Sequence, residues 1–330
     1  MAGEMSDAWV QDGLRVRRSR LEDAIRSSPD DAQLTRLLGE VDTALERVGN
    51  GTYGLCEVCH QPIEAERLQA DPLTSFCLDH LSHAQRQALE EDLALASQVQ
   101  ERLLPKQSLQ ASGWEAAYYY DPAGPVSGDY CDLLDVEGGL HFVVGDVSGK
   151  GVSAAMLMAH LHAMLRALVY QGLPLDQVMA RASRMLCENT LPTQFATAVC
   201  GKASATGTVQ LSNAGHDPVL FSRGSEIGRI GATGLPLGMF SDEEFTVSTM
   251  QFAPGDTLLL HTDGVTETLD ASGREYGSDR LAEMLKRHRR AAPRDILSAC
   301  ITDLRSFRSG TTMTDDVTIL VLQRLEAGSP

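Results

Sequence analysis

The chain has 330 residues, of which 43% are hydrophobic, and its formal net charge is -17. This length predicts about two domains, and no apolar run reaches the roughly 18 residues needed to cross a bilayer. A strongly acidic surface repels phosphate backbones, which disfavours direct nucleic-acid binding. The N-terminus is polar and acidic, unlike a signal peptide. We therefore expect a cytoplasmic protein without a membrane anchor.

The first part of the chain predicts a helical hairpin. Apolar residues recur at helical spacing from 8 to 48, and the segment 27–31, Ser-Ser-Pro-Asp-Asp, interrupts them. Asp30 and Asp31 would lie at the tip of this hairpin. A solvated turn explains two aspartates beside a proline.

The next segment carries two pairs of metal-ligand side chains. Cys56 and Cys59 form the first pair, and Cys77 and His80 follow after seventeen residues. Each pair presents two ligands from one tight turn, and a tetrahedral zinc ion needs two such pairs. Because the protein supplies all four ligands, we expect a closed, structural zinc site.

The surrounding residues resemble the zinc finger of the DksA/TraR family. The resemblance covers about residues 35–81 and rests on Leu45-Glu46-Arg47, Gly51 to Cys56, Pro62-Ile63 and Glu66-Arg67-Leu68. Some members of that family act on RNA polymerase, which implies RNA polymerase as an alternative partner. His80 stands where this family usually has its fourth cysteine, and its spacing suits a zinc ligand. His60 and His83 remain as alternatives to His80 for the fourth ligand.

Residues 82–104 predict a further helix, which Pro105 ends. We assign 82–108 as a linker helix between two domains. Its apolar stripe would either pair with a second copy, giving a homodimer, or pack on its own domain.

From about residue 113 the pattern changes to short apolar runs separated by Gly- and Asp-rich turns. The predicted strands include 140–144, 208–212, 257–261 and 317–322, and the predicted helices lie near 152–170, 175–190 and 278–307. Grouped strands with interspersed helices fit an α+β layered domain better than strict alternation of strand and helix.

Aspartates stand next to several of these runs. Asp146 and Asp263 each end an apolar strand, Asp315 and Asp316 precede another, and Asp129 lies in an earlier segment. Strand ends in one sheet bring such carboxylates to one edge, where they repel one another unless a cation neutralises them. Hard oxygen ligands select Mg²⁺ or Mn²⁺. The pattern predicts a binuclear Mg²⁺ or Mn²⁺ site.

The order of these segments resembles the PPM-type metal-dependent phosphatases, specifically the RsbU/SpoIIE branch. The resemblance covers about residues 98–323. Its motifs are G-D-V-S-G-K-G at 145–151, F-x-T at 195–197, N-A-G-H at 213–216, G-x-P-L-G at 234–238, T-D-G-V-x-E at 262–267 and D-D-V-T at 315–318. It implies an α-β-β-α sandwich at 109–325, preceded by the hairpin and finger at 1–81.

The same resemblance implies the roles of the site residues. The implied ligands of two Mn²⁺ or Mg²⁺ ions are Asp129, Asp146, Val147, Asp263, Asp315 and Asp316. Asp146 would bridge both ions, with the carbonyl of Val147 as a further ligand. Asp263 and Asp315 would hold one ion and Asp129 would approach the other. The carboxylates of these four aspartates would carry catalysis.

The implied function is a protein serine/threonine phosphatase that hydrolyses the phosphoester by attack of a metal-activated water. The implied substrate is a phosphorylated regulatory protein, such as an anti-sigma-factor antagonist, and the N-terminal module would regulate the enzyme. The alternative is a transcription regulator that binds RNA polymerase through the hairpin and finger. Lys150 would face the phosphate or solvent, His216 would support a turn, and Asp132 would be a turn residue.

Overall fold

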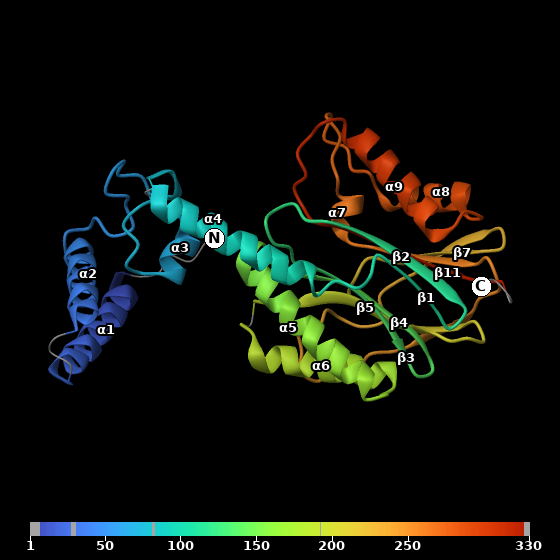
Figure 1. Ribbon diagram of the computed structural model, residues 1–330, viewed down its shortest axis with the longest axis horizontal. Coiled ribbons are helices and arrows are strands. Elements are labelled where there is room, and N and C mark those ends of the chain that lie inside the picture. The colour runs from blue at the N-terminus through green and yellow to red at the C-terminus, as the bar shows by residue number, and fades with distance from the viewer. Residues whose placement is uncertain (1–6, 28–30, 81–82, 192, 327–330) are drawn as a thin grey trace. The chain divides into compact units, whose positions relative to one another are not determined.

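The computed structural model describes residues 7–27, 31–80, 83–191 and 193–326 (Figure 1). The chain forms two compact units, Met1–Asp92 and Leu93–Pro330. The boundary falls within helix α4 (His83–Glu101). The finer division into 1–81, 82–108 and 109–325 stays a prediction.

The first unit opens with the predicted hairpin, formed by α1 (Asp7–Ser27) and α2 (Ala32–Gly49). The two helices bury Val10, Leu14 and Val41 between them, and Arg18 Nε lies 2.6 Å from Asp42 Oδ1 across the pair. Asp31 caps α2, because its side chain accepts hydrogen bonds from the backbone N–H groups of Gln33 and Leu34. Asp30 lies outside the described residues.

The second unit contains two antiparallel sheets in its described part. The six-stranded sheet runs, in spatial order, β1 (Ser108–Ala111), β2 (Trp114–Asp121), β11 (Val317–Arg324), β10 (Thr257–His261), β7 (Val219–Arg223) and β8 (Glu226–Ile230). The five-stranded sheet runs β3 (Asp129–Val136), β4 (Gly139–Val147), β5 (Ala196–Ala203), β6 (Thr208–Ala214) and β9 (Ser248–Gln251).

Helices cover the outer face of each sheet. They are α5 (Gly151–Tyr170) and α6 (Leu175–Asn189) on the five-stranded sheet, with α8 (Ser278–His288) and α9 (Pro293–Arg308) on the six-stranded sheet (Figure 1). The predicted α-β-β-α sandwich is confirmed. The helix predicted at 278–307 is in fact two helices, because Pro293 begins the second one at its first turn.

The described part of the sandwich has three apolar cores, one between the sheets and one on the outer face of each. They form because successive side chains of a strand point to opposite faces. In β4, Phe142 and Val144 pack between the sheets, whereas Val143 and Val147 face α5 and α6. Strands buried on both faces read as continuous apolar runs, which is why the sequence shows them so clearly.

Among the described residues, helix α5 is long and apolar enough to cross a membrane, by length and composition alone. Half of its apolar stretch is buried inside the unit. Residues such as Met158, Leu161 and Leu165 contribute to the core between this helix and the five-stranded sheet. The helix is therefore a core helix of the sandwich.

Candidate metal centres

The sheet register brings the predicted aspartates toward one end of the sandwich. Asp129 begins β3 and lies directly opposite Asp146 near the end of β4. Asp263 begins the short helix α7 (Asp263–Thr266) directly after β10, and Asp315 lies just before β11. Strands β10 and β11 are antiparallel neighbours, so the end of one meets the start of the other.

A close backbone approach fixes the position of α7 beside the D-D-V-T segment. A Cβ atom added to Gly264 would lie 1.9 Å from the carbonyl oxygen of Asp316. No side chain fits in that space, so glycine is required directly after Asp263. This contact holds the Asp263 backbone against the segment that carries Asp315.

Asp129 joins the two sheets at this end. Its carboxylate is buried, and Oδ2 accepts hydrogen bonds from Thr262 Oγ1, at 2.8 Å, and from Thr318 Oγ1. Thr262 directly follows β10 and Thr318 is the second residue of β11, so both hydroxyls come from the side of the other sheet. The sequence interpretation had no role for these threonines, although each stands within a quoted motif.

Burial and neighbouring carboxylates raise the pKa of Asp146, Asp263 and Asp129. Burial, followed by the carboxylates of Asp263, Asp315 and Asp316, raises the pKa of Asp146 to about 7. Burial, followed by Asp315 and other carboxylates, raises the pKa of Asp263 to about 6. Burial also raises the pKa of Asp129 well above its usual range. Such mutual repulsion is what a divalent cation would relieve.

The donor set fits a hard cation. Carboxylate and carbonyl oxygens are the ligands that Mg²⁺ and Mn²⁺ prefer, and the predicted ligands Asp146, Asp263 and Asp315 supply the carboxylates. Within the described ranges, three or more of these carboxylates do not gather within 4.8 Å of one another. They line a wider edge than the finger ligands do, and repulsion between like charges favours this wider spacing.

Two of the predicted ligands make backbone contacts with the residues that precede β3. Both carboxylate oxygens of Asp316 accept backbone hydrogen bonds, from Ala123 N at 2.7 Å and from Gly128 N at 3.0 Å. The backbone N–H of Val147 donates to the carbonyl oxygen of Gly128. Both carboxylate oxygens of Asp316 are therefore engaged by backbone groups of the protein.

Lys150 bonds to the edge that carries Asp146, Asp263 and Asp315, which we call the acidic edge. Its ammonium group lies 2.8 Å from Asp315 Oδ2 and 2.8 Å from the carbonyl oxygen of Thr314, while the side chain is 69% exposed. Asp315 raises the pKa of Lys150. The positive charge thus lies beside a predicted metal ligand and is accessible from solvent.

The buried His216 connects strands rather than facing the aspartates. Its Nε2 donates to the carbonyl oxygen of His261 at 3.0 Å, so Nδ1 accepts from the Thr197 hydroxyl at 2.8 Å. Its backbone N–H donates to Asn213 Oδ1, and burial lowers the pKa of the ring to about 4. A neutral histidine in these bonds supports the turn, as predicted.

Asp132 differs from its prediction as a turn residue. It is a fully buried residue of β3 that pairs with Arg166 of α5 through two hydrogen bonds, of 2.6 and 2.8 Å. The Tyr130 hydroxyl donates to the same carboxylate at 3.1 Å. The partner lies on a different element, so sequence spacing gave no signal for this ion pair.

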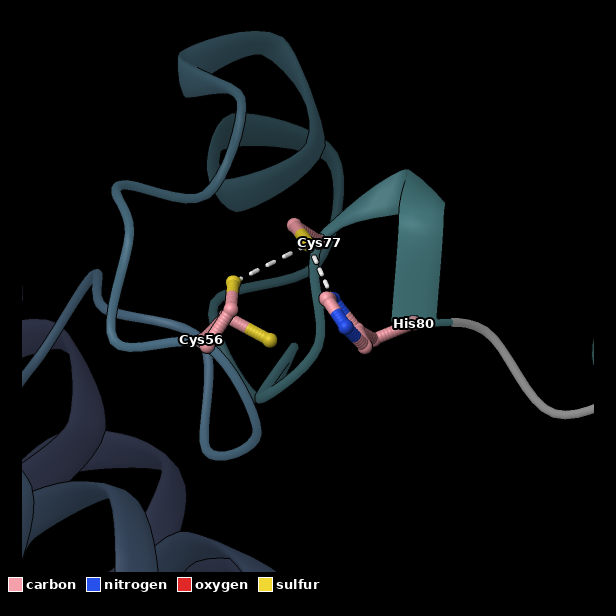
Figure 2. Close-up of side chains that lie close together, drawn as sticks. Cys56, Cys77 and His80 are labelled. Atoms are coloured by element: carbon pink, nitrogen blue, oxygen red, sulfur yellow. Dashed lines mark hydrogen bonds between the residues drawn. The ribbon is translucent and has the colours of Figure 1, made fainter.

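The finger in the first unit gathers the four predicted ligands. The ligand atoms of Cys56, Cys59, Cys77 and His80 all lie within 4.8 Å of one another. Cys77 Sγ is 3.8 Å from Cys59 Sγ and 3.1 Å from His80 Nδ1. Figure 2 shows Cys56, Cys77 and His80 pointing toward one another.

The chemistry of these side chains fits zinc. Desolvation opposes ionisation of Cys56, but backbone hydrogen bonds from Cys59, Cys77 and Val58 outweigh it and lower its pKa to about 6. Thiolates are the form that binds zinc. His80 is part of the described ligand group, whereas His60 is not. The side chain of His83 lies outside the described part of the chain.

Both regions match known families. A family described as Stage II sporulation protein E (SpoIIE) matches residues 136–325. A prokaryotic dksA/traR C4-type zinc finger matches residues 51–79. That match ends one residue before His80, the predicted substitute for the fourth cysteine.

Three curated relatives match more than half of the chain. The chain is 28% identical to Protein IcfG of Synechocystis, over 71% of this chain and 41% of that protein. It is 24% identical to the phosphoserine phosphatase RsbU of Bacillus subtilis, over 72% of each chain. It is 29% identical to the phosphoserine phosphatase RsbP of the same organism, over 60% of this chain and 49% of RsbP. The chain thus spans less than half the length of IcfG and of RsbP.

Solved structures share the fold. The SiaA-PP2C domain of Pseudomonas aeruginosa has a TM-score of 0.66 at 21% identity, covering 74% of this chain and 100% of that one. The RsbU and RsbW domains of Rv1364c from Mycobacterium tuberculosis have a TM-score of 0.58 at 28% identity, covering 69% of this chain and 63% of that one. With a family match over more than half of its length, the chain belongs to the SpoIIE family, and its second unit has the fold of a PP2C phosphatase domain.

Proposed function

We propose that this protein is a metal-dependent protein serine/threonine phosphatase. The observation that carries the proposal is the acidic edge, where burial and the neighbouring carboxylates together raise the pKa of Asp146 to about 7. Membership of the SpoIIE family and similarity to two phosphoserine phosphatases support the same reaction.

The residues at this edge would have different roles in metal binding, in sheet alignment and in substrate binding. Asp146, Asp263 and Asp315 would hold two Mn²⁺ or Mg²⁺ ions, with the carbonyl of Val147 as a further ligand. When bound, such ions supply Lewis acidity and lower the pKa of a coordinated water. Asp129 would keep the two sheets in register through its threonine hydrogen bonds. Lys150 would attract the substrate phosphoryl group to the edge.

The substrate would be a phosphorylated regulatory protein of the anti-sigma-factor antagonist type, acting in the cytoplasm. The names of RsbU and RsbP support a phosphoserine substrate, and the pairing of RsbU and RsbW domains in Rv1364c supports a regulatory partner. The finger would hold one structural zinc ion. RNA polymerase as a partner, and a homodimer through residues 82–108, stay predictions.

Hydrolysis by the full-length chain tests the function. We expect Mn²⁺-dependent release of phosphate from a phosphoserine form of an anti-sigma-factor antagonist, with little release from a phosphotyrosine peptide. Removal of Mn²⁺ and Mg²⁺ should stop the reaction, and adding back Mn²⁺ should restore it. Hydrolysis that continues at the same rate without divalent cations would contradict the proposal.

A further inference from the structure

The segment 122–128, which joins β2 to β3, touches the predicted metal ligands directly. The carbonyl oxygen of Gly128 accepts from Val147 N at 3.3 Å. A Cβ atom added to Gly128 would lie 3.3 Å from Asp146 Oδ1 and 3.1 Å from the carbonyl oxygen of Val147. We call this segment the β2–β3 loop. Any shift of the loop would change the space around the Asp146 carboxylate.

Gln100 of α4 holds this loop from one side. Its Nε2 donates to the carbonyl oxygen of Ser127 at 2.7 Å, and the Ser127 N–H donates to Gln100 Oε1 at 2.9 Å. The glutamine side chain thus pairs with the loop backbone as a neighbouring strand would. Gln100 is 7% exposed, so water competes little for these bonds.

Asp316 holds the same loop from the other side. Oδ1 accepts from Ala123 N at 2.7 Å and Oδ2 accepts from Gly128 N at 3.0 Å. One carboxylate therefore pins both ends of the loop. Hydrogen bonds from N–H groups to a charged acceptor are stronger than neutral ones.

We propose that Gln100 and Asp316 are positioning residues that together clamp the β2–β3 loop against the corner formed by Asp146 and Val147. Neither side chain needs to touch the reacting atoms. The clamp keeps the Asp146 carboxylate and the Val147 carbonyl in one geometry. Its effect on turnover rests on the proposed function, whereas its effect on the loop does not.

Hydrogen exchange of the protein without Mn²⁺ or Mg²⁺ tests the clamp independently of catalysis. Gln100→Met retains the length and burial of the side chain but removes both hydrogen bonds. We expect faster exchange of the Ser127 and Gly128 amides in this variant. Gln98→Met is the matched control, because Gln98 is an exposed residue of the same helix, and it should exchange as wild type. Unchanged exchange at Ser127 in Gln100→Met would overturn the proposal.

Turnover gives the second readout. Residues that support metal ligands typically contribute roughly 10–100-fold to activity or metal affinity, so we expect Gln100→Met to lower kcat by that factor with a smaller change in KM. Asp316→Asn should speed exchange at Ala123 or Gly128 without added metal. If Asp316 were only a metal ligand, its variant would weaken Mn²⁺ binding and leave that exchange unchanged, which would overturn its part of the proposal.

A double-mutant cycle links the two residues. Both hold one loop, so combining Gln100→Met with Asp316→Asn should cost less in kcat than the product of the single effects. The pair Gln98→Met and Asp316→Asn serves as the additive reference. Fully multiplicative losses in the Gln100 pair would overturn the shared clamp.

Discussion

The finger and the acidic edge are two groups of predicted metal ligands that are built in opposite ways. The finger takes its four ligands from residues 56–80, and their ligand atoms lie within 4.8 Å of one another. The carboxylates of the acidic edge are far apart in the sequence, between Asp129 and Asp315. Their proximity depends on the strand register of the two sheets. A local ligand set is prearranged by its own turns, whereas a dispersed set depends on the folding of the whole sandwich.

The largest expected effect is the loss of hydrolysis on replacing Asp146. Asp146→Asn removes the charge of a proposed metal ligand. Because bound metal ions supply several kcal/mol of transition-state stabilisation, we expect roughly a 10³-fold lower kcat/KM. The measurement is Mn²⁺-dependent hydrolysis of p-nitrophenyl phosphate. Asp135→Asn, an exposed residue of β3, should behave as wild type. Zinc content should not change in either variant, which would separate the edge from the finger.

The buried ion pair between Asp132 and Arg166 sharpens the comparison, because here an arginine side chain neutralises the carboxylate. Arg166→Ala leaves the buried Asp132 without its partner, and we expect a loss of about 3 kcal/mol in the free energy of unfolding of the second unit. Urea denaturation followed by circular dichroism measures it. Arg184→Ala, on the exposed face of α6, is the control. Equal stability of the two variants would show that the pair contributes little.

Within the finger, the fourth ligand can be tested by comparing two histidines. His80→Ala should weaken zinc binding by roughly 10-fold or more, because it removes one of four ligands. His60→Ala should retain wild-type affinity. Competition with a chromogenic chelator reports both values. The opposite ranking of the two variants would assign His60 as the ligand.

The smallest effect is a pH dependence of stability without added Mn²⁺ or Mg²⁺. The pKa of Asp146 is about 7 and that of Asp263 about 6, both above the roughly 3.9 of an unfolded aspartate. The folded chain therefore binds extra protons between about pH 4 and pH 7, and its stability falls as pH rises through that window. Asp146→Asn should flatten the fall in Tm. A Tm that rises from about pH 5 to pH 8 in both proteins would contradict the shifts.

Much of this molecule could be predicted from patterns that are local in sequence. The spacing of Cys56, Cys59, Cys77 and His80 predicted the finger, and apolar runs such as 257–261 predicted strands buried on both faces. The position of Asp146 and Asp263 at strand ends predicted that they share an edge. Each of these signals depends on neighbours within a few residues.

The remaining features depend on contacts between distant segments. Gln100 meets Ser127, Asp132 meets Arg166 and Asp316 meets Ala123 only after the strands have paired. No periodicity marks a residue for such a contact. The break between α8 and α9, unlike these contacts, has a local signal in the sequence, because Pro293 is a residue type that favours the first turn of a helix.

The most direct test of the central claim is manganese binding to the zinc-loaded, full-length chain. Calorimetric titration should give about two Mn²⁺ ions per chain for the wild type. Asp146→Asn should lose measurable Mn²⁺ binding and keep its zinc. Identical Mn²⁺ uptake by the wild type and Asp146→Asn would contradict the assignment of the acidic edge as a metal centre.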